Sequence, residues 1–383
     1  MISVAFKMLV GNKASFLGVI FGIFLALLLI SQQSAIFLGL VSRSYRMVTD
    51  MPLPNLWVID SATQGEDTIR RMPEGYLDFV RSVPGVEWAV PINFMNIPLV
   101  TKKGDFQIAQ IYGIDDETLI GGPIEMIEGR VRDLQREGAV IVDVLSANSS
   151  LATTLPDGTI EPLKIGDSLE INQHRAVVVG ICKITPGFYP QPILFVTNSQ
   201  FNYFNGFATN RIGYIAAKTT PGVNENTVIA QINPHLVLEA LTRQQFKNKI
   251  SDHFLKTGIL INFGLSVVLG LIIGFSIAGQ IFYIMTLNNI NYFALMKALG
   301  GTHLMIFKMI TFQALLTGAI GYLLGTGATL LWGMAIKDTT LAFLFPWQLL
   351  LFTGVITLLI CLFTVALSVR KIYRLNPQVL MGS

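Results

Sequence analysis

Four segments of the chain are apolar along their whole length, and a long polar interval separates the first from the other three. A helix needs about 20 apolar residues to cross the hydrocarbon core of a bilayer. The four segments meet that length and contain no acidic or basic residue: 15–40, 257–286, 309–335 and 346–369. We therefore predict four transmembrane helices, with residues 41–256 inserted between the first and the second.

The inserted interval alternates short apolar runs with turn residues, which predicts a mixed α/β domain. A helix is expected over 73–82, before the Val83–Pro84–Gly85 turn, and antiparallel strands are expected around Asn172–Gln173 within 163–184. Further strands are expected at 55–60, in a three-strand meander over 86–115, at 138–145 with a helix after it, at 192–198 and at 211–218.

The end of this domain reads as helical. Residues 223–249 have a helical pattern that is interrupted at Pro234, and 237–256 is expected to run as one stalk helix into the second span. A boundary between two subdomains is expected near 110–120. Pairing of an early strand with late strands, which would make the division discontinuous, is the alternative.

Charge sets the expected orientation. Of the 24 Asp and Glu residues, 23 lie between Asp50 and Asp252, and the other is Asp338 in the short outer loop 336–345. Seven basic residues and no acid lie near span ends in 1–14, in 287–308 and in the tail 370–383. Because short cytoplasmic segments of membrane proteins are enriched in Lys and Arg, both termini and the 287–308 loop are predicted to be cytoplasmic. Residues 41–256 would then be extracytoplasmic, and the chain would lie in the inner (plasma) membrane.

The N-terminal segment has two features to explain. Val4, Ala5, Met8 and Leu9 recur at helical spacing, so an interfacial helix on the cytoplasmic leaflet is expected within 1–14, with a plain polar leader as the alternative. The apolar run that follows continues past Ser34 to Val41, longer than a signal-peptide core. A retained span is therefore expected, with a cleaved signal as the alternative.

Composition agrees with a membrane protein and excludes several other classes. Hydrophobic residues make up 52% of the chain and charged residues 13%, against about 25% charged in ordinary soluble domains. Mean hydropathy is +0.56. A net charge of +3 gives no reason to expect nucleic acid. Cys182 is expected in a strand of the outer domain and Cys361 in a span, so the two should not form a disulfide.

Small residues recur on single helix faces of two spans. Such faces let helix backbones approach closely, and helix association in lipid depends on that approach. A packing role is expected for these glycines, although glycine is common in membrane helices anyway: Gly270, Gly274, Gly318, Gly321 and Gly325.

The segment 292–325 carries the most specific pattern. It reads YFALMKALGGTHLMIFKMITFQALLTGAIGYLLG, with the loop core Ala294–Gly301 and then Phe312–Gln313–Ala314–Leu315. This resembles the cytoplasmic loop and following span of the FtsX/MacB-like family of ABC transporter permeases. The layout of one span, a large outer domain and three spans is similar as well. Tyr292 and Gln313 stand where many members have Glu.

The resemblance implies a function. In this family the loop is a short coupling helix that docks on an ATPase subunit, and here it would be an amphipathic knob that ends at Gly300–Gly301. The implied coupling residues are Tyr292, Ala294, Lys297, Ala298, Leu299, Gly300 and Gly301. The chain would be the permease subunit that passes ATP-driven movement to the periplasmic domain, for export or extraction of a lipid, lipoprotein, peptide or other amphiphile. An ordinary cytoplasmic hairpin is the alternative to the coupling helix.

The implied partners are an ABC ATPase dimer and a second copy of the chain. A periplasmic membrane fusion protein and an outer-membrane channel are further candidates. The chain has no GxxxxGK[ST] phosphate loop, so ATP would be bound by the partner ATPase and this chain would bind no cofactor. The alternative function is a transmembrane signalling subunit that activates a periplasmic partner, such as a cell-wall hydrolase, without transport.

No pattern of catalytic or metal-binding residues supports an enzyme. The four histidines are far apart in sequence, with no HExxH, His/Cys cluster or GxSxG motif: His174, His235, His253 and His303. Neighbouring acids such as Asp115–Asp116 are explained by solvated turns. The aromatic stretch Pro186–Pro190 is expected to be a turn, and an exposed contact loop is considered for it.

Overall fold

A computed structural model describes residues 2–11, 13–154, 158–206, 210–235, 237–256, 258–336, 339 and 341–373. The chain divides into two compact units, one of residues 1–40 with 259–383 and one of residues 41–258. Within the described part of the chain, four helices are long and apolar enough to cross a membrane. The second unit is a mixed α/β domain inserted between the first and second of these helices, which confirms the predicted fold class.

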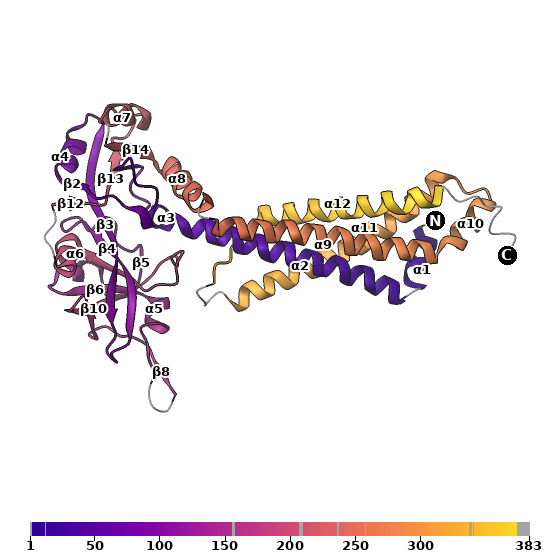
Figure 1. Ribbon diagram of the computed structural model, residues 1–383, viewed down its shortest axis with the longest axis horizontal. Helices are drawn as coiled ribbons and strands as arrows, with labels where there is room; N and C mark the ends of the chain where they lie inside the picture. Colours follow the sequence, from indigo (N-terminus) through magenta and orange to yellow (C-terminus); the bar gives the residue numbers. More distant parts are fainter. Residues whose placement is uncertain are drawn as a thin grey trace. The chain divides into compact units, whose positions relative to one another are not determined.

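The first unit is a helical bundle, in which the long helices lie side by side (Figure 1). Its helices are α1 (Ile2–Gly11), α2 (Lys13–Ser44), α9 (Ile259–Asn288), α10 (Ile290–Ala298), α11 (His303–Ala335) and α12 (Trp347–Tyr373). Their shared core contains Val19, Ile23, Phe282, Ile310 and Ile360. A polar pair, Ser31 Oγ and Thr329 Oγ1 at 2.6 Å, joins α2 to α11 inside this core.

The N-terminal helix exists, but its apolar face does not lie free as an interfacial helix would. Ala5 and Leu9 are fully buried, and the side-chain amide of Gln313 on α11 donates to the carbonyl oxygen of Ala5 at 2.8 Å. The expected interfacial helix is therefore packed on the bundle through that face. Val4, which was expected on the same face, stays exposed, as does Phe6.

The second unit is built on a mixed sheet of ten strands in the described residues, in the order β14-β1-β13-β3-β4-β11-β6-β10-β5, with β9 beside β10 and β3. The strands of this sheet are β1 (Leu56–Asp60), β3 (Val86–Val100), β4 (Phe106–Ile114), β5 (Glu125–Glu128), β6 (Ala139–Asp143), β9 (Ser168–Ile171), β10 (His174–Lys183), β11 (Ile193–Thr197), β13 (Tyr214–Thr219) and β14 (Leu238–Thr242). Two-stranded pairs are β2 (Met72–Pro73) with β12 (Arg211–Ile212), and β7 (Thr153–Thr154) with β8 (Ile160–Glu161).

Short helices cover this sheet. They are α3 (Arg46–Asp50), α4 (Gly75–Ser82), α5 (Val144–Asn148), α6 (Asn198–Asn205), α7 (Glu225–Ile232) and α8 (Arg243–Lys256), with 3-10 turns at Glu66–Thr68 and Val131–Gln135. Strands β1, β6 and β11 are buried at every position, as expected of strands covered on both faces.

Strand β3 divides the domain into two lobes that share one sheet. Its first half pairs with β13 and its second half with β4. One hydrophobic core combines early and late residues such as Leu56, Val80 and Ile215, and a second core contains residues of 97–204 such as Ile111 and Val196. The division is therefore discontinuous, and the break expected near 110–120 is wrong because 106–114 is the interior strand β4.

Most of the predicted elements of this domain are present. The strand at 55–60, the helix within 73–82 and the strand followed by a helix at 138–145 are confirmed. Asn172 and Gln173 have φ of 46° and 66° and close a two-residue hairpin between β9 and β10, as left-handed residues do in such turns. The three-strand meander over 86–115 is wrong, because Val86–Val100 forms one strand of 15 residues that continues through Pro91 and Pro98.

The expected single stalk helix over 237–256 is also wrong. Leu238–Thr242 is strand β14, which pairs with β1, and the helix begins only at Arg243. The helix ends at Lys256, and Gly258 has a φ of +82° that breaks it before α9. The apolar residues of 238–242 alternate in burial and suit a sheet edge as well as a helix.

The aromatic stretch 186–190 is not a fully exposed contact loop. The ring of Phe188 packs on Phe254 of α8, with 4.5 Å between the ring centroids. Of the two aromatic residues in this stretch, Phe188 and Tyr189, only Tyr189 is exposed. Of the two cysteines, Cys182 lies buried in β10 and Cys361 lies buried in α12.

Candidate functional site

The predicted coupling helix corresponds to α10, and two glycines end it. Gly300 has a φ of +86°, which only glycine adopts without strain. The amide of Gly300 donates to the Lys297 carbonyl at 3.2 Å and that of Gly301 to the Met296 carbonyl at 2.9 Å. These two bonds form a Schellman cap. A Cβ at Gly301 would lie 2.7 Å from the Met296 oxygen, so both positions require glycine.

Most of the exposed side of α10 is apolar, with Asn291 as an exposed polar residue. Tyr292, Leu295 and Leu299 are 60%, 59% and 80% exposed, while Phe293 is buried against the bundle. The helix was expected to be amphipathic, and that expectation is wrong because apolar residues occupy both its buried and its exposed sides. Ala294 and Lys297 are partly buried, and the side chain of Ala298 lies outside the described part of the structure.

A groove of about 550 Å³ lies between α1 and the junction of α9 with α10. Val4, Lys7 and Met8 line it from α1, and Tyr292 and Leu295 line it from α10. The bond from Gln313 to the Ala5 carbonyl holds α1 in place beside this groove. Asn289, whose side chain donates to the Met285 carbonyl, shapes the turn that begins α10.

The five glycines expected to pack helices all lie at helix contacts. A Cβ at Gly270 or Gly274 would meet Ile30 or Ala26 of α2. Gly321 and Gly325 of α11 also face α2, where a Cβ would meet Ile23 and Leu27 respectively, and Gly318 faces Cys361 of α12. The bundle has further close approaches at glycines that the sequence did not single out, among them Gly39 and Gly333, which both meet Phe343.

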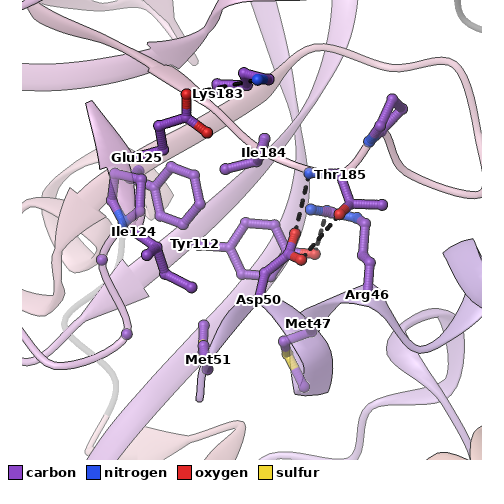
Figure 2. Close-up of a pocket in the computed structure, with 15 residues that line it drawn as sticks. Arg46, Met47, Asp50, Met51, Tyr112, Ile124, Glu125, Lys183, Ile184 and Thr185 are labelled. Carbon is purple, nitrogen blue, oxygen red and sulfur yellow. Dashed lines mark hydrogen bonds and ion pairs between the residues drawn. The ribbon is translucent and has the colours of Figure 1, made fainter. Parts of the chain in front are cut away.

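The outer domain holds a second candidate site, which sequence reasoning missed. It is a cavity of about 400 Å³ next to α3. Figure 2 shows the polar side chains that converge on it, and Met47, Met51, Ile124, Ile184 and Phe195 supply apolar walls. Its residues come from α3, β4, the segment 121–125, the segment 183–186 and β11, so only long-range strand pairing brings them together.

Two opposite charges of α3 line this cavity. Arg46 is 2% exposed, and its Nη2 donates to Gln110 Oε1 and to the hydroxyl of Tyr112. Asp50 accepts from the backbone amide of Thr185 at 3.2 Å and from its hydroxyl at 2.9 Å. Burial raises the pKa of Asp50, although the bonds from Thr185 and the charge of Arg46 oppose that shift.

Tyr112 connects the network to a second carboxylate. Its hydroxyl donates to Glu66 Oε1 at 3.1 Å, and the Arg46 guanidinium lies over its ring at 4.9 Å from the centroid. Burial raises the pKa of Tyr112 well above its ordinary value, so this hydroxyl remains a donor. Among the described residues, no three His, Cys, Asp or Glu side chains are grouped as metal ligands.

Comparison with protein families assigns both units. The family model for the MacB-like periplasmic core domain matches residues 14–235, and that for the FtsX-like permease C-terminal domain matches residues 264–377. The chain belongs to the FtsX/MacB-like permease family. The predicted family is thereby confirmed.

Solved structures of MacB-like outer domains are similar to part of the chain. One is the periplasmic region of MacB from Actinobacillus actinomycetemcomitans, at 15% identity and a TM-score of 0.40, covering 54% of this chain and 96% of that one. Another is the extracellular domain of the noncanonic ABC-type transporter YknZ from Gram-positive bacteria, at 13% identity and a TM-score of 0.35, covering 49% and 99%. The comparison with curated protein sequences gives no match.

Gln313 departs from the Glu that the sequence resemblance led us to expect, and the structure gives this departure a physical role. Gln313 donates a hydrogen bond to a backbone carbonyl. An ionised carboxylate has no proton to donate, so a charged Glu at this position could not make the same bond. The second departure, Tyr292, adds an exposed ring to the α1–α10 groove.

Proposed function

We propose that the chain is the membrane permease subunit of an ABC transporter. A separate cytoplasmic ATPase dimer would bind α10 and the α1–α10 groove, and two copies of the chain would pair with it. Movement of α10 would pass through the bundle to the periplasmic domain. The cargo would be a lipid, lipoprotein, peptide or other amphiphile, exported or extracted from the membrane, with the assistance of a periplasmic adaptor.

The observation that carries this proposal is the exposed apolar side of α10. Tyr292, Leu295 and Leu299 form an apolar surface beside a groove. Exposed apolar patches next to polar residues are typical of sites that bind another protein or a membrane. The Schellman cap at Gly300–Gly301 fixes the end of this surface. A force applied there reaches α11 through a short, rigid connection.

The distribution of charge supports a cytoplasmic position for α10 and indicates which kind of ATPase surface would bind it. The segments 1–14, 287–308 and 370–383 contain basic residues and no acid, which favours a cytoplasmic position for all three. An acidic rim on the ATPase would complement Lys7 at the groove.

The bundle offers a direct route for the movement. Helix α11, which follows α10, contacts α2 at Gly321 and Gly325, where the side chains of Ile23 and Leu27 lie directly against the α11 backbone. Helices α2 and α9 are the two spans that the chain connects to the outer domain. Close packing of this kind would transmit displacement because it leaves little free space between the two helices.

Co-purification from native membranes tests the proposal. The wild-type chain is expected to retain an ABC ATPase, and Leu295→Asp with Leu299→Asp should lose at least nine-tenths of it because a buried unpaired carboxylate is costly. Ile160→Asp, an equally exposed position in the outer domain, is the control and should retain the ATPase. Retention by the double variant, or no ATPase with the wild type, would contradict the coupling role.

A transport assay with the same complex separates export from the signalling alternative. Cargo movement that requires ATP and intact α10 is the expected result. An ATPase cycle that activates a periplasmic hydrolase and moves no cargo would assign the complex to signalling.

A further inference from the structure

The cavity beside α3 in the outer domain has the size and composition of a small-molecule site. Such sites usually occupy about 300–1,000 Å³ and combine apolar walls with a few converging polar groups. This one measures about 400 Å³ and has Met51, Ile124 and Phe195 in its apolar walls. None of these features is needed for the ATPase contact proposed above.

The arrangement of Arg46 and Asp50 points to the ligand. The two residues are four apart on α3, a spacing at which opposite charges on a helix commonly pair. Among the described residues, their charged groups do not come close enough to form an ion pair with each other. Instead Arg46 bonds to the neutral groups of Gln110 and Tyr112. Asp50 bonds to Thr185, as Figure 2 shows.

Separated charges in a cleft are costly unless something compensates them. A buried cation and a partly buried carboxylate lose hydration, and hydrogen bonds to neutral groups restore only part of it. Arg46 Nε is buried and has no hydrogen-bond partner among the described residues, so the protein does not satisfy the guanidinium completely. Asp50 is disfavoured in its charged form by the same burial.

Other charges at the site are already paired or lie farther from the cavity. Lys183 and Glu125 form an exposed ion pair at 3.5 Å on the rim. Glu66 accepts from Tyr112, and Asp143 accepts from the amides of Ser146 and Ile193. Arg46 and Asp50 therefore remain as the two charges of the cavity wall whose side chains form hydrogen bonds to neutral groups only, although each charge still acts on the other at longer range.

We propose that this cavity binds a small zwitterion with an apolar side. The anionic group of the ligand would lie at Arg46 and its ammonium group at Asp50, while its apolar part would contact the Met51, Ile124 and Phe195 walls. The free termini of an amino acid or short peptide carry this chemistry, and so does a phosphoethanolamine head group. The site does not depend on whether α10 contacts an ATPase.

The test is calorimetric titration of the full-length chain in lipid nanodiscs, with empty nanodiscs subtracted. The probes are Leu-Leu, N-acetyl-Leu-Leu, Leu-Leu-amide and the doubly blocked N-acetyl-Leu-Leu-amide, which differ only in their terminal charges. Leu-Leu should bind once per chain and at least tenfold more tightly than each blocked form. Glycerophosphoethanolamine, titrated in parallel, shows whether a lipid head group fits better than a peptide.

Variants assign the two charges and the wall. Asp50→Asn keeps the acceptor for Thr185, and it should lower the affinity for Leu-Leu at least tenfold while leaving that for N-acetyl-Leu-Leu unchanged. Arg46→Gln should also lower the affinity for Leu-Leu at least tenfold, and it should leave the affinity for Leu-Leu-amide unchanged. Ile124→Trp should fill the cavity and weaken every probe, whereas Ile127→Trp, also exposed but outside the cavity, should weaken none.

Three results would overturn the proposal. They are the absence of saturable binding of Leu-Leu and of glycerophosphoethanolamine, equal binding of the doubly blocked peptide, and unchanged binding in Asp50→Asn. The Asp50 and Ile124 variants keep the test decisive even if Arg46→Gln does not fold.

Discussion

The two units bring distant residues together by different means. In the helical bundle, contacts occur where side chains are missing, as at Gly321 and Gly325, which face α2 directly. In the outer domain, the corresponding contacts are polar, and they join α3 to β4 through Arg46 and Tyr112 and to the segment after β10 through Thr185. Small-residue contacts can be recognised in a sequence, whereas a polar network depends on which strands become neighbours.

The largest expected effect is in the polar network. Arg46→Ala leaves Tyr112, Gln110 and the nearby carboxylates without their buried cation, and should lower the free energy of unfolding of the outer domain by about 3 kcal/mol. Urea unfolding measures it through Trp57 and Trp88 fluorescence, with Trp332 and Trp347 replaced by Phe. Arg136→Ala removes an exposed ion pair with Asp133 and should cost under about 1 kcal/mol. An equal loss of stability in Arg46→Ala and Arg136→Ala would show that the Arg46 network does not stabilise the outer domain more than an exposed ion pair does.

A smaller effect is expected in the bundle. Gly325→Ala places a Cβ 2.9 Å from the Leu27 Cβ and 3.0 Å from the Phe24 carbonyl oxygen, so α2 and α11 must separate. Overpacking of this kind should cost roughly 1–3 kcal/mol, which heating in detergent followed by size-exclusion chromatography would detect. Gly327→Ala on the same helix meets nothing within 4 Å and should leave the transition unchanged. An equal shift of the thermal transition in Gly325→Ala and Gly327→Ala would contradict the close contact of Gly325 with α2.

The bond that holds α1 can be weakened with a single substitution. Gln313→Glu removes the donor to the Ala5 carbonyl at neutral pH, and should cost about 1–2 kcal/mol of local stability. Hydrogen exchange of α1, corrected for intrinsic rates, should increase. Protection of α1 in Gln313→Glu should recover at low pH, where a protonated Glu can donate. In Gln313→Met, α1 should exchange fast at every pH. Protection that does not change in either variant would show that the bond does not hold α1.

The smallest expected effect is a gain in stability, from the substitution Asp50→Asn. Burial raises the pKa of Asp50 in the folded domain above its unfolded value of about 3.9. The folded state therefore binds this proton more tightly, and its contribution to stability is lost as pH rises through the folded pKa. Asp50→Asn should make the outer domain slightly more stable than wild type at pH 7 and equally stable below about pH 4. A variant less stable at pH 7 would show that the ionised carboxylate stabilises the fold.

Much of the architecture could be predicted because its signals are local. Uninterrupted apolar segments predicted the four helices, and Asn172–Gln173 predicted the hairpin whose two left-handed residues the structure shows. Gly300–Gly301 predicted the end of α10 for the same reason. Each of these depends on a few consecutive residues and on no distant partner.

The errors arose where distant partners decide the structure. The pattern of 238–242 suits a helix, but pairing with β1 makes it a strand. Pro98 lies inside β3 because its ladder continues through neighbouring residues such as Ile97 and Leu99. The cavity beside α3 requires β4, β11 and the 183–186 segment to meet, and no local pattern indicates that. Its one sequence signal is the spacing of Arg46 and Asp50 after the first span.

The central claim is that α10 lies in the cytosol and is covered by an ATPase. Labelling of Leu299→Cys with a membrane-impermeant maleimide tests it most directly, because Leu299 is highly exposed while the native Cys182 and Cys361 are both buried. We expect labelling in inverted vesicles only, with little label until the ATPase is stripped from the membrane by a urea wash. Labelling from the outer side of intact cells, or equal labelling before and after the wash, would contradict the claim.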